Sequence, residues 1–265
     1  YTVEEANAEN TRGLVAGQTA EVAYELKGTN VGNYTGIFET AVIKNAEEDV
    51  TANYTVTKTP GKLTITKAEI AQYVTLTPTD VKKTYDGNVY AAGTATASDT
   101  NGNDLKIEYQ KADGSWTTNP SEITATNVSD SKIVNVRVSA GNYEGYVNGT
   151  EELTITARPI TITGDGWASD QSYTGNEYKK TTYTVEEANA ENTRGLVAGQ
   201  KVNTSYEIKG TNAGTYTGAF GEKFEIKTAG GAFGIGAEDV TANYTVTKTP
   251  GKLTITKAEI AQYVT

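Results

Sequence analysis

The sequence predicts an all-β protein built as a tandem string of antiparallel β-sandwich domains. Apolar and polar residues alternate along short segments, which is the period expected of half-buried strands. Glycine and proline lie between these segments, where chain reversals need them. An internal repeat divides the chain into small domains, because residues 53–75 recur letter for letter as residues 243–265, and residues 1–18 recur as residues 183–200.

The composition removes the usual residues of most catalytic chemistries. The 265 residues include no cysteine, methionine or histidine, which excludes disulfides, thiolate nucleophiles, histidine bases and the usual ligation of zinc or haem. We therefore expect no enzyme activity and no cofactor. The aromatic residues are mostly tyrosine, 17 against 4 phenylalanines. Tyrosine combines an apolar ring with a polar hydroxyl, which suits thin β-sheet layers that have one apolar face and one face exposed to solvent.

The charge argues against two classes of partner. A net charge of −10 and a pI near 4.7 disfavour nucleic acid and anionic membranes, since both need clustered lysine and arginine. No long apolar run and no charged-then-apolar leader is present, so we expect neither a membrane span nor a signal peptide in this segment. The missing initiator methionine fits a window of a longer, exported bacterial protein, and we expect an extracellular location on the cell surface.

The first predicted domain comprises residues 1–68 and lacks an opening strand. Residues 54–57 and residues 63–66 alternate like two strands. The Pro60-Gly61 pair between them predicts a β-hairpin, in which proline presets φ and glycine takes a positive φ. Residues 20–26 alternate in the same way as their copies at 202–208, which predicts a central strand in each copy.

Two other segments of this domain are predicted as turns. Residues 32–36 place Tyr34 between two glycines, which indicates a turn with the tyrosine ring packed against the end of a sheet. Residues 3–10, repeated at residues 185–192, are acidic and have no apolar stripe. An exposed turn or a single helical turn is therefore favoured over a packed helix.

The second predicted domain comprises residues 69–157 and is a diverged relative of the other two. Its opening at residues 83–90 aligns with residues 171–178 of the third domain. Residues 105–109 and residues 134–138 alternate as strands, and Asp-Gly or Gly-Asn turn signals follow them.

The third predicted domain comprises residues 158–258. Pro159 at its opening is expected to block continuous ladder pairing across the boundary and to stiffen it. A glycine-rich insertion at residues 228–237 predicts a surface loop whose apolar residues fold back, or else a contact with a neighbour. Residues 259–265 copy the opening of the middle domain, so they are expected to be the opening strand of a further domain.

Several motifs resemble the MBG or YDG-type repeats of large bacterial cell-surface proteins. These motifs are Tyr85-Asp86-Gly87, the Gly-Leu-Val-Ala-Gly segment at residues 13–17 with its copy at 195–199, residues 48–54 and residues 61–67. The resemblance covers nearly the whole chain, although the middle domain lacks the Gly-Leu-Val-Ala-Gly and Glu-Asp-Val-Thr-Ala segments. It implies Ig-like β-sandwich domains that form an elongated rod, a stalk or adhesive function, and no catalytic residue.

One polar turn of the middle domain has oxygen donors spaced as in a calcium loop. The candidate calcium ligands are Asp99, Asn101, Asn103 and Asp104. The glycine is misplaced for such a loop, and Gln110 stands where a bidentate glutamate belongs. A type I′ hairpin turn at the Asn-Gly pair is therefore favoured over calcium. The acidic runs at residues 47–49 and 238–239 are alternative oxygen donors near domain boundaries.

Carbohydrate chemistry has few candidate residues. Trp116 and Trp167 are candidates for stacking on a glycan, but half-buried packing is the favoured interpretation of a lone aromatic residue on a sandwich. Carboxylate pairs for glycoside hydrolysis are available at residues 4–5 and 151–152. Neighbours on a strand point to opposite faces, so solvated charge is favoured for both pairs.

A covalent lysine–asparagine cross-link, which some surface modules carry, requires a lysine, an asparagine or aspartate and an acid in an apolar core. The chain contains all these residue types, but its lysines cluster at strand ends, where their amino groups reach water. A non-covalent sandwich is favoured.

Two functions from different classes compete. In the first, the domains are structural repeats of an extracellular bacterial stalk or fibre, and their partners are neighbouring copies of the repeat. In the second, they are adhesin modules that bind mucin, a glycan or a host protein, and the diverged middle domain is the one that recognises the ligand. The two copies differ mainly at residues 19–47 and 201–237, while their ends are identical, which favours the structural function.

The two ends of the sequence are out of phase with the predicted domains. Residues 259–265 of one copy would complete residues 1–68 of the next if strands were exchanged between molecules, giving a head-to-tail polymer. Continuation of the chain is the favoured alternative, because residues 69–75 already serve as an ordinary internal opening.

Overall fold

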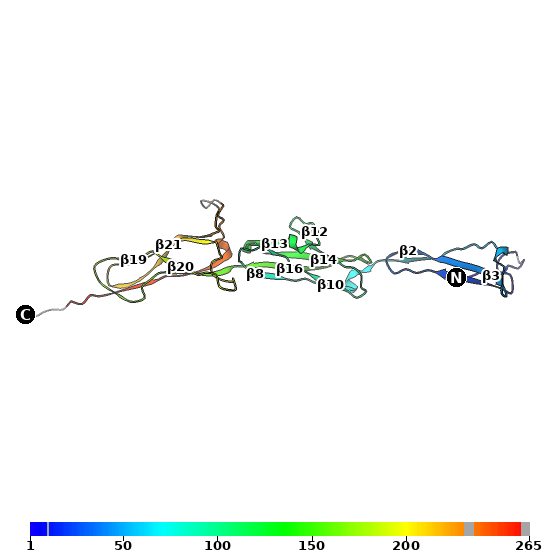
Figure 1. Ribbon diagram of the computed structural model, residues 1–265, viewed down its shortest axis with the longest axis horizontal. Helices are drawn as coiled ribbons and strands as arrows, with labels where there is room; N and C mark the ends of the chain where they lie inside the picture. Colours follow the sequence, from blue (N-terminus) through cyan, green and yellow to red (C-terminus); the bar gives the residue numbers. More distant parts are fainter. Residues whose placement is uncertain (10, 231–235, 261–265) are drawn as a thin grey trace, which may run out of the picture. The chain divides into compact units, whose positions relative to one another are not determined.

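The computed structural model describes residues 1–9, 11–230 and 236–260 (Figure 1). Within these ranges all regular structure is β-strand or short 3-10 helix, which confirms the predicted all-β class. Two compact units are present, the first comprising Tyr1–Thr75, Ala97–Lys106 and Val138–Val147, and the second the remaining described residues. We call residues 1–68, 69–157 and 158–258 the first, middle and third modules, boundaries that stay predictions.

The first unit contains the strands of the first module. They are β1 (Gln18–Glu25), β2 (Gly32–Thr35), β3 (Ile37–Asn45), β4 (Glu48–Asp49), β5 (Lys62–Ile65) and β6 (Ala68–Glu69), with 3-10 helices at Thr51–Asn53 and Ile70–Gln72. One sheet has the order β1-β3-β4, and β2 pairs with β5 in a second. Strand β6 pairs in parallel with β15 (Tyr143–Glu144) of the middle module.

The middle module contributes a mixed sheet of five strands. Its strands are β7 (Val74–Thr77), β8 (Val81–Thr84), β9 (Tyr90–Ala91), β10 (Thr96–Asp99), β11 (Lys106–Gln110), β12 (Trp116–Thr117), β13 (Thr124–Ala125), β14 (Lys132–Ser139) and β16 (Val147–Thr156), with 3-10 helices at Pro120–Glu122 and Val128–Asp130. The large sheet has the order β12-β11-β14-β16-β8, while β7 pairs with β10 and β9 with β13.

The third module lies wholly in the second unit. Its strands are β17 (Arg158–Gly164), β18 (Gln171–Ser172), β19 (Tyr178–Lys180), β20 (Tyr183–Val185), β21 (Lys201–Gly210), β22 (Gly214–Thr217), β23 (Ala219–Lys227), β24 (Tyr244–Thr249) and β25 (Lys252–Thr256), with a 3-10 helix at Thr241–Asn243. They form three sheets with the orders β20-β17-β24, β18-β25-β22 and β19-β21-β23.

Most of the predicted alternation is confirmed. The apolar face of β14 is buried, and β1 alternates between half-buried and exposed residues along its whole length. The predicted central position holds for β21, which lies between β19 and β23, but not for β1, whose neighbour among the described strands is β3 alone. The prediction of purely antiparallel sheets is wrong, because β8 pairs with β16, and β17 with β24, in parallel.

The predicted β-hairpin around the Pro-Gly pair is also wrong. In the third module β24 and β25 flank this pair but belong to different sheets, so the chain switches sheets there instead of folding back. Neither Gly61 nor Gly251 has a positive φ. Glycine is needed at 251 for close approach, because a Cβ atom there would lie 2.5 Å from the carbonyl oxygen of Asp165.

Of three smaller predictions, one is wrong and two are confirmed. Residues 32–35, predicted as a turn, form β2, and the Tyr34 hydroxyl donates to the carbonyl of Asn30 at 2.7 Å. Pro159 lies inside β17, and strand pairing does not continue across the boundary, as predicted: β16 pairs with β14 and β8, whereas β17 pairs with β20 and β24. The acidic segment that begins at Val3 is largely exposed and not helical in its described residues, which confirms that it is not a packed helix, and Glu5 forms a single parallel bridge with Leu14.

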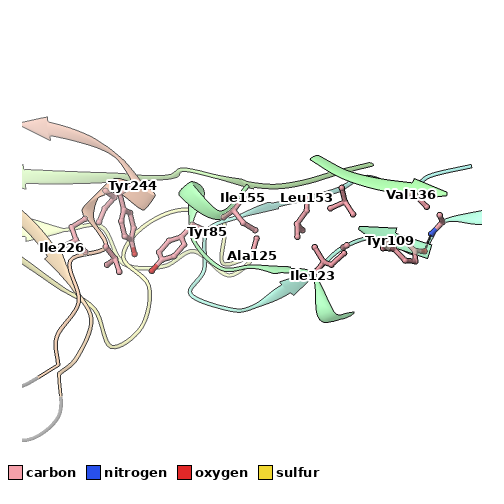
Figure 2. Packing of buried hydrophobic residues seen from close by; sticks show 14 residues of the cluster. Tyr85, Tyr109, Ile123, Ala125, Val136, Leu153, Ile155, Ile226 and Tyr244 are labelled. Carbon is pink, nitrogen blue, oxygen red and sulfur yellow. Dashed lines mark hydrogen bonds between the residues drawn. The ribbon is translucent and has the colours of Figure 1, made fainter. Parts of the chain in front are cut away.

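The buried core of the second unit runs from the middle module into the third (Figure 2). Leu153 and Ile155 of β16 share one cluster with Ile160 of β17. On the third-module side, Ile226 and Tyr244 complete the cluster, and the Tyr244 ring meets the edge of the Tyr85 ring at 5.5 Å. Burial of side chains this large supplies most of the driving force for folding.

We predict that replacing the equivalent glycine by alanine lowers the free energy of unfolding by different amounts in the two copies. Gly251→Ala should lower the free energy of unfolding by about 2–3 kcal/mol, because the new methyl group meets backbone atoms that cannot move aside. Gly61→Ala should cost less than about 1 kcal/mol, since the nearest atom is the Tyr24 hydroxyl at 2.9 Å, the far end of a side chain. Urea unfolding of both variants measures the difference, and equal costs would refute the explanation.

Candidate functional sites at the module joins

The first unit contains a polar cluster where the first module meets residues of the middle module. The Asn142 side chain accepts from the backbone N–H of Val31 at 3.0 Å and donates to the Asn30 side chain at 2.9 Å. The same amide group also donates to Asn103 at 2.7 Å. One asparagine side chain therefore ties the loop before β2 to the turn after β10.

Asp99 anchors the middle-module side of this cluster. Its carboxylate accepts from the Asn103 backbone at 2.8 Å, from the Asn103 side chain at 2.7 Å and from the Tyr143 hydroxyl at 2.8 Å. The Tyr143 ring stacks on Tyr73 with ring centroids 5.5 Å apart. Although partial desolvation opposes ionisation, these hydrogen bonds lower the pKa of Asp99 to about 2.

The four calcium candidates are only partly brought together. Asn101 and Asn103 both donate to the Tyr143 hydroxyl, so their amide groups are directed into the join, and Asp104 is exposed. Gly102 has a positive φ but Asn101 does not, so the turn is not of the predicted type I′. In the described ranges no group of three or more acidic side chains could hold a metal ion.

The acidic runs at residues 47–49 and 238–239 form hydrogen bonds with neighbouring residues in the sequence. Asp49 accepts from the backbone N–H of Thr51 at 2.9 Å, and Asp239 accepts in the same way from Thr241 at 2.9 Å. Hydrogen bonds from these threonine side chains and backbones lower the pKa of both carboxyl groups. Each aspartate thus stabilises the 3-10 turn that follows it.

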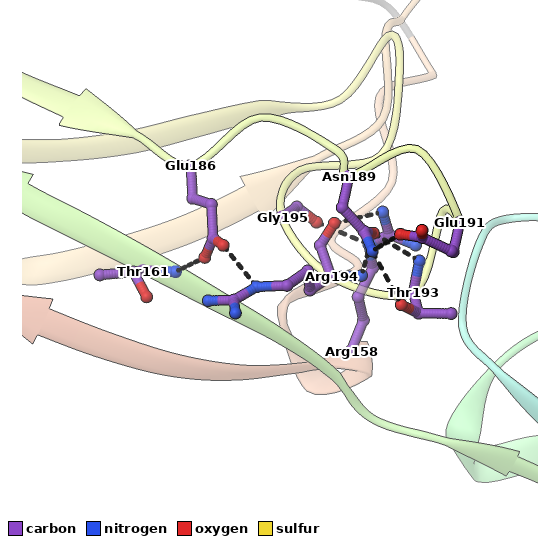
Figure 3. A network of polar contacts seen from close by, with 8 residues as sticks. All are labelled: Arg158, Thr161, Glu186, Asn189, Glu191, Thr193, Arg194 and Gly195. Atoms are coloured by element: carbon purple, nitrogen blue, oxygen red, sulfur yellow. Dashed lines mark hydrogen bonds and ion pairs between the residues drawn. The ribbon is translucent and has the colours of Figure 1, made fainter.

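In the second unit, Arg158 is the central polar residue at the start of the third module (Figure 3). Its side chain is fully buried, and Nε donates to the carbonyl of Gly195 at 2.6 Å. The terminal nitrogens donate to the carbonyls of Arg194 at 2.7 Å and Asn192, and to the Asn192 side chain at 3.0 Å. A further bond, to the Tyr85 carbonyl at 3.3 Å, reaches the middle module.

The sequence analysis missed this role of Arg158. Its position within β17 is in phase with Ile160 and Ile162, so strand alternation places the arginine on the apolar face. That phase is the signal that could have revealed a buried guanidinium group.

Two further contacts join the middle and third modules. Gln200 donates to the Tyr85 hydroxyl at 2.9 Å and accepts from the Tyr244 hydroxyl at 2.7 Å. Asn243 accepts from the backbone of Val128 at 2.8 Å and donates to the Asn127 side chain at 2.8 Å. Burial raises the pKa of the Tyr244 phenol to about 12, so this group stays a neutral donor.

Trp116, the candidate ligand-binding residue, is half-buried on β12. The Arg137 guanidinium group lies 3.9 Å from the centre of its ring and is itself paired with Glu108 at 2.9 Å. A stacked cation thus covers one face of the ring. Trp167 is also half-buried, with the Lys180 amino group 4.7 Å from its ring centre.

The expectation of solvated charge is wrong for one carboxylate pair. Glu151 and Glu152 do point to opposite faces of β16, but Glu151 is only 1% exposed and its Oε1 has no hydrogen-bond partner. Burial raises the pKa of Glu151, although the backbone of Thr79 donates to its second oxygen at 3.4 Å. Glu4 is exposed and pairs with Arg12 at 2.6 Å.

A lysine–asparagine cross-link has no buried lysine to start from in the part of the chain that the structure describes. The buried polar and charged residues there are Glu108, Glu151, Arg158 and Asn243. The apolar residues of the insertion, Phe233 and Ile235, and most of the predicted opening strand, residues 261–265, lie outside the described residues.

Comparisons with known proteins give no family. No family model and no curated protein matches the chain. Among solved structures, the chain is similar at 13% identity to the I-band fragment I67–I69 of titin, covering 94% of this chain and 90% of that one with a TM-score of 0.24. An endo-fucoidan hydrolase of glycoside hydrolase family 107 matches at 12% identity, covering 94% of this chain and 40% of that one with a TM-score of 0.22. Scores this low carry no argument about fold or activity.

The described residues contain no helix that is long and apolar enough to span a membrane.

We predict a pH-dependent effect of Tyr143→Phe. The lowered pKa of Asp99 means that its ionised form stabilises the first unit above pH 4 and that this contribution is lost as pH falls toward about 2. Removing the hydroxyl should therefore destabilise the first unit at pH 6 and have little effect at pH 2. Thermal unfolding at both pH values tests this, with the exposed Tyr173→Phe as control. An equal loss at both pH values would contradict it.

We also predict that Arg158→Ala destabilises the second unit by about 2–4 kcal/mol. The substitution leaves a cavity and several buried oxygens without a donor, and hydrogen bonds to charged groups each contribute about 1.5–3 kcal/mol. Arg194→Ala is the matched control, because its side chain is more than half exposed and forms an ion pair with Glu186 of a kind worth about 0–1 kcal/mol. Urea unfolding compares the two, and similar losses would exclude a special role for Arg158.

Proposed function

We propose that this chain is a structural repeat segment of an extracellular bacterial stalk or fibre. The first and third modules act as interchangeable spacers, and the middle module acts as the connector between them. The partners are neighbouring copies of the same repeat. The adhesin alternative, in which the modules bind mucin, a glycan or a host protein, is treated below as an outcome of the test.

The observation that carries the proposal is that the first module repeats the joining surface of the third. Gln200 and Tyr244 contact the middle module, and their copies Gln18 and Tyr54 are hydrogen-bonded to each other in the same way, at 2.5 Å against 2.7 Å. The Tyr54 hydroxyl also accepts from Val15 at 3.1 Å, the distance found between Tyr244 and Val197. The first module therefore carries a surface fit for a module of the middle type.

The other end of the repeat is duplicated as well. Tyr34 donates to the carbonyl of Asn30 at 2.7 Å beside the first join, and Tyr216 donates to Asn212 at 2.9 Å in the third module. Asn30 is one of the residues that contact Asn142 of the middle module. Both copies thus present the same two ends, as a repeating polymer requires.

Four further observations support a mechanical over a chemical function. The composition lacks histidine and cysteine, and two of the buried polar residues in the described ranges, Arg158 and Asn243, are used in a join. The resemblance to MBG or YDG-type repeats favours Ig-like surface modules with no catalytic residue. Trp116, the candidate glycan residue, has one face covered by Arg137.

Immunogold electron microscopy of intact cells that make the parent protein tests the proposal. An antibody raised against this chain should label filaments or stalks outside the cell at repeated positions along their length. Labelling that appears only after the cells are lysed would contradict the extracellular assignment. Labelling confined to filament tips, together with glycan-array binding that Trp116→Ala abolishes, would replace the structural function with the adhesin function.

A further inference from the structure

We propose that the two joins described above share one recognition element, an asparagine clasp that selects which loop of the preceding module is bound. The clasp is an Asn-Tyr turn whose asparagine side chain binds a loop of sequence Asn-Val in the module before it. It presupposes the proposed stalk function, since its partner is a neighbouring module of the same repeat, and it adds the residues by which that partner is recognised.

In the first unit, the clasp binds the loop before β2. The Asn142 side chain accepts from the backbone N–H of Val31 at 3.0 Å and donates to the side-chain oxygen of Asn30 at 2.9 Å. Its other amide hydrogen goes to the side-chain oxygen of Asn103 at 2.7 Å. Both hydrogens of the amide therefore have an acceptor. This fixes the orientation in which the amide oxygen faces Val31, because the flipped amide would set oxygen against oxygen.

In the second unit, an equivalent asparagine binds an equivalent loop. Asn243 accepts from the backbone N–H of Val128 and donates to the side-chain oxygen of Asn127, both at 2.8 Å. The loop again has the sequence Asn-Val, and the asparagine that binds it is only 4% exposed. The same two bonds therefore serve two joins whose preceding members, the first and the middle module, have diverged in sequence.

The turn that presents the asparagine is also shared. A tyrosine follows the asparagine in both clasps, and its backbone N–H donates to the carbonyl three residues earlier, at 3.2 Å for Tyr143 and 3.0 Å for Tyr244. Each tyrosine hydroxyl donates within its own module, to Asp99 at 2.8 Å or to Gln200 at 2.7 Å. The tyrosine thus fixes the turn to its own module, while the asparagine reaches the preceding one.

These bonds define the ligand of the clasp. It must offer a backbone N–H to an outside acceptor and, one residue earlier, a side-chain oxygen that accepts from an amide. The side chain of the second loop residue makes neither bond, and the first and third modules differ there, Val31 against Ala213, while both keep the asparagine before it. The ligand is therefore asparagine or aspartate followed by any residue except proline, which lacks the N–H.

The clasp discriminates mainly by rejecting loops that do not match. A loop without the side-chain oxygen leaves the amide donor of the clasp unpaired, and a loop without the N–H leaves its acceptor unpaired. A buried polar group that loses its partner costs more free energy than the bond contributes when it is made. Selection through such a penalty separates correct from incorrect neighbours without requiring a strong contact.

Hydrogen exchange of two backbone amides in the full chain tests the clasp. The N–H groups of Val31 and Val128 report on the two joins separately, because each donates to a different asparagine. Asn142→Ala should lower the protection factor of Val31 by about tenfold, as expected when one well-paired hydrogen bond is lost, and leave that of Val128 unchanged. Asn243→Ala should do the reverse. Residue-resolved NMR measures both amides in every variant.

Substitutions in the bound loop test the recognition itself. Asn30→Asp keeps an oxygen for the Asn142 amide and should retain the protection of Val31. Asn30→Leu has a similar shape but no oxygen, and should lower the protection about threefold or more. Val31→Ala, which introduces the residue found at 213, should retain protection, since the clasp binds the backbone. Because Asn30 is exposed, its variants keep the test decisive even if Asn142→Ala does not fold.

Asn53→Ala is the matched control for the shared turn. Residues 48–54 repeat residues 238–244, so Asn53 has the sequence context of Asn243, but its side chain is exposed. Both reporter amides should exchange in this variant as they do in the unchanged chain. Circular dichroism confirms that each variant stays folded.

Three results would overturn the proposal. These are no protection of Val31 and Val128 in the unchanged chain, equal losses at both amides in Asn142→Ala, and equal effects of Asn30→Asp and Asn30→Leu. None of them affects the immunogold result, so failure of the clasp and failure of the proposed stalk function are distinguishable.

Discussion

The pairing of β17 on both of its edges is the interaction on which the third module depends. A strand with two neighbours satisfies its backbone groups on each side, and here it also delivers Ile160, Ile162 and Arg158 to the interior. The arginine reaches back to the carbonyl of Tyr85, so the strand that seals one module also ties it to the module before it. The same strand therefore stabilises the fold of the third module and its contact with the middle module.

Close approach of backbone and tyrosine rings is the second constraint. The Tyr206 hydroxyl accepts from Gly251 at 3.0 Å and donates to the carbonyl of Asp165 at 3.0 Å. A Cβ atom at Gly164 or Gly218 would lie within about 2 Å of the same ring. The first copy keeps the pattern at Gly36, where a Cβ atom would lie 1.9 Å from the Tyr24 hydroxyl. The glycines at 218 and 251 recur at 36 and 61, so both copies keep a close approach of the backbone to a tyrosine hydroxyl.

The sequence predicted the strands well and their pairing poorly. Alternation located β14, β21 and most other strands, because the side-chain period depends only on which face is buried. Pairing depends on long-range contacts, so the sequence pattern predicts a hairpin at the Pro-Gly segment, whereas in the third module this segment joins two sheets. The parallel ladder between β8 and β16 could not be deduced either, since these strands are far apart in the sequence.

For the candidate sites, too, the sequence predicted local features better than long-range contacts. Asp99, Asn101 and Asn103 were found as a polar cluster from their spacing, but their use in a join depends on Tyr143, which is distant in the sequence. Arg158 and Glu151 were missed because both are charged residues on apolar faces, where composition suggests solvent. Sequence patterns thus locate polar groups more readily than they reveal which of them are buried.

The parallel ladders also determine how a module would carry tension. In the third module the entering strand β17 lies beside β24, near the end of the module, and in the middle module the early strand β8 lies beside the final strand β16. Because paired strands near the two ends run in the same direction, a pull that separates those ends draws them past each other along their axes. The hydrogen bonds of the ladder are then loaded together in shear rather than opened one after another.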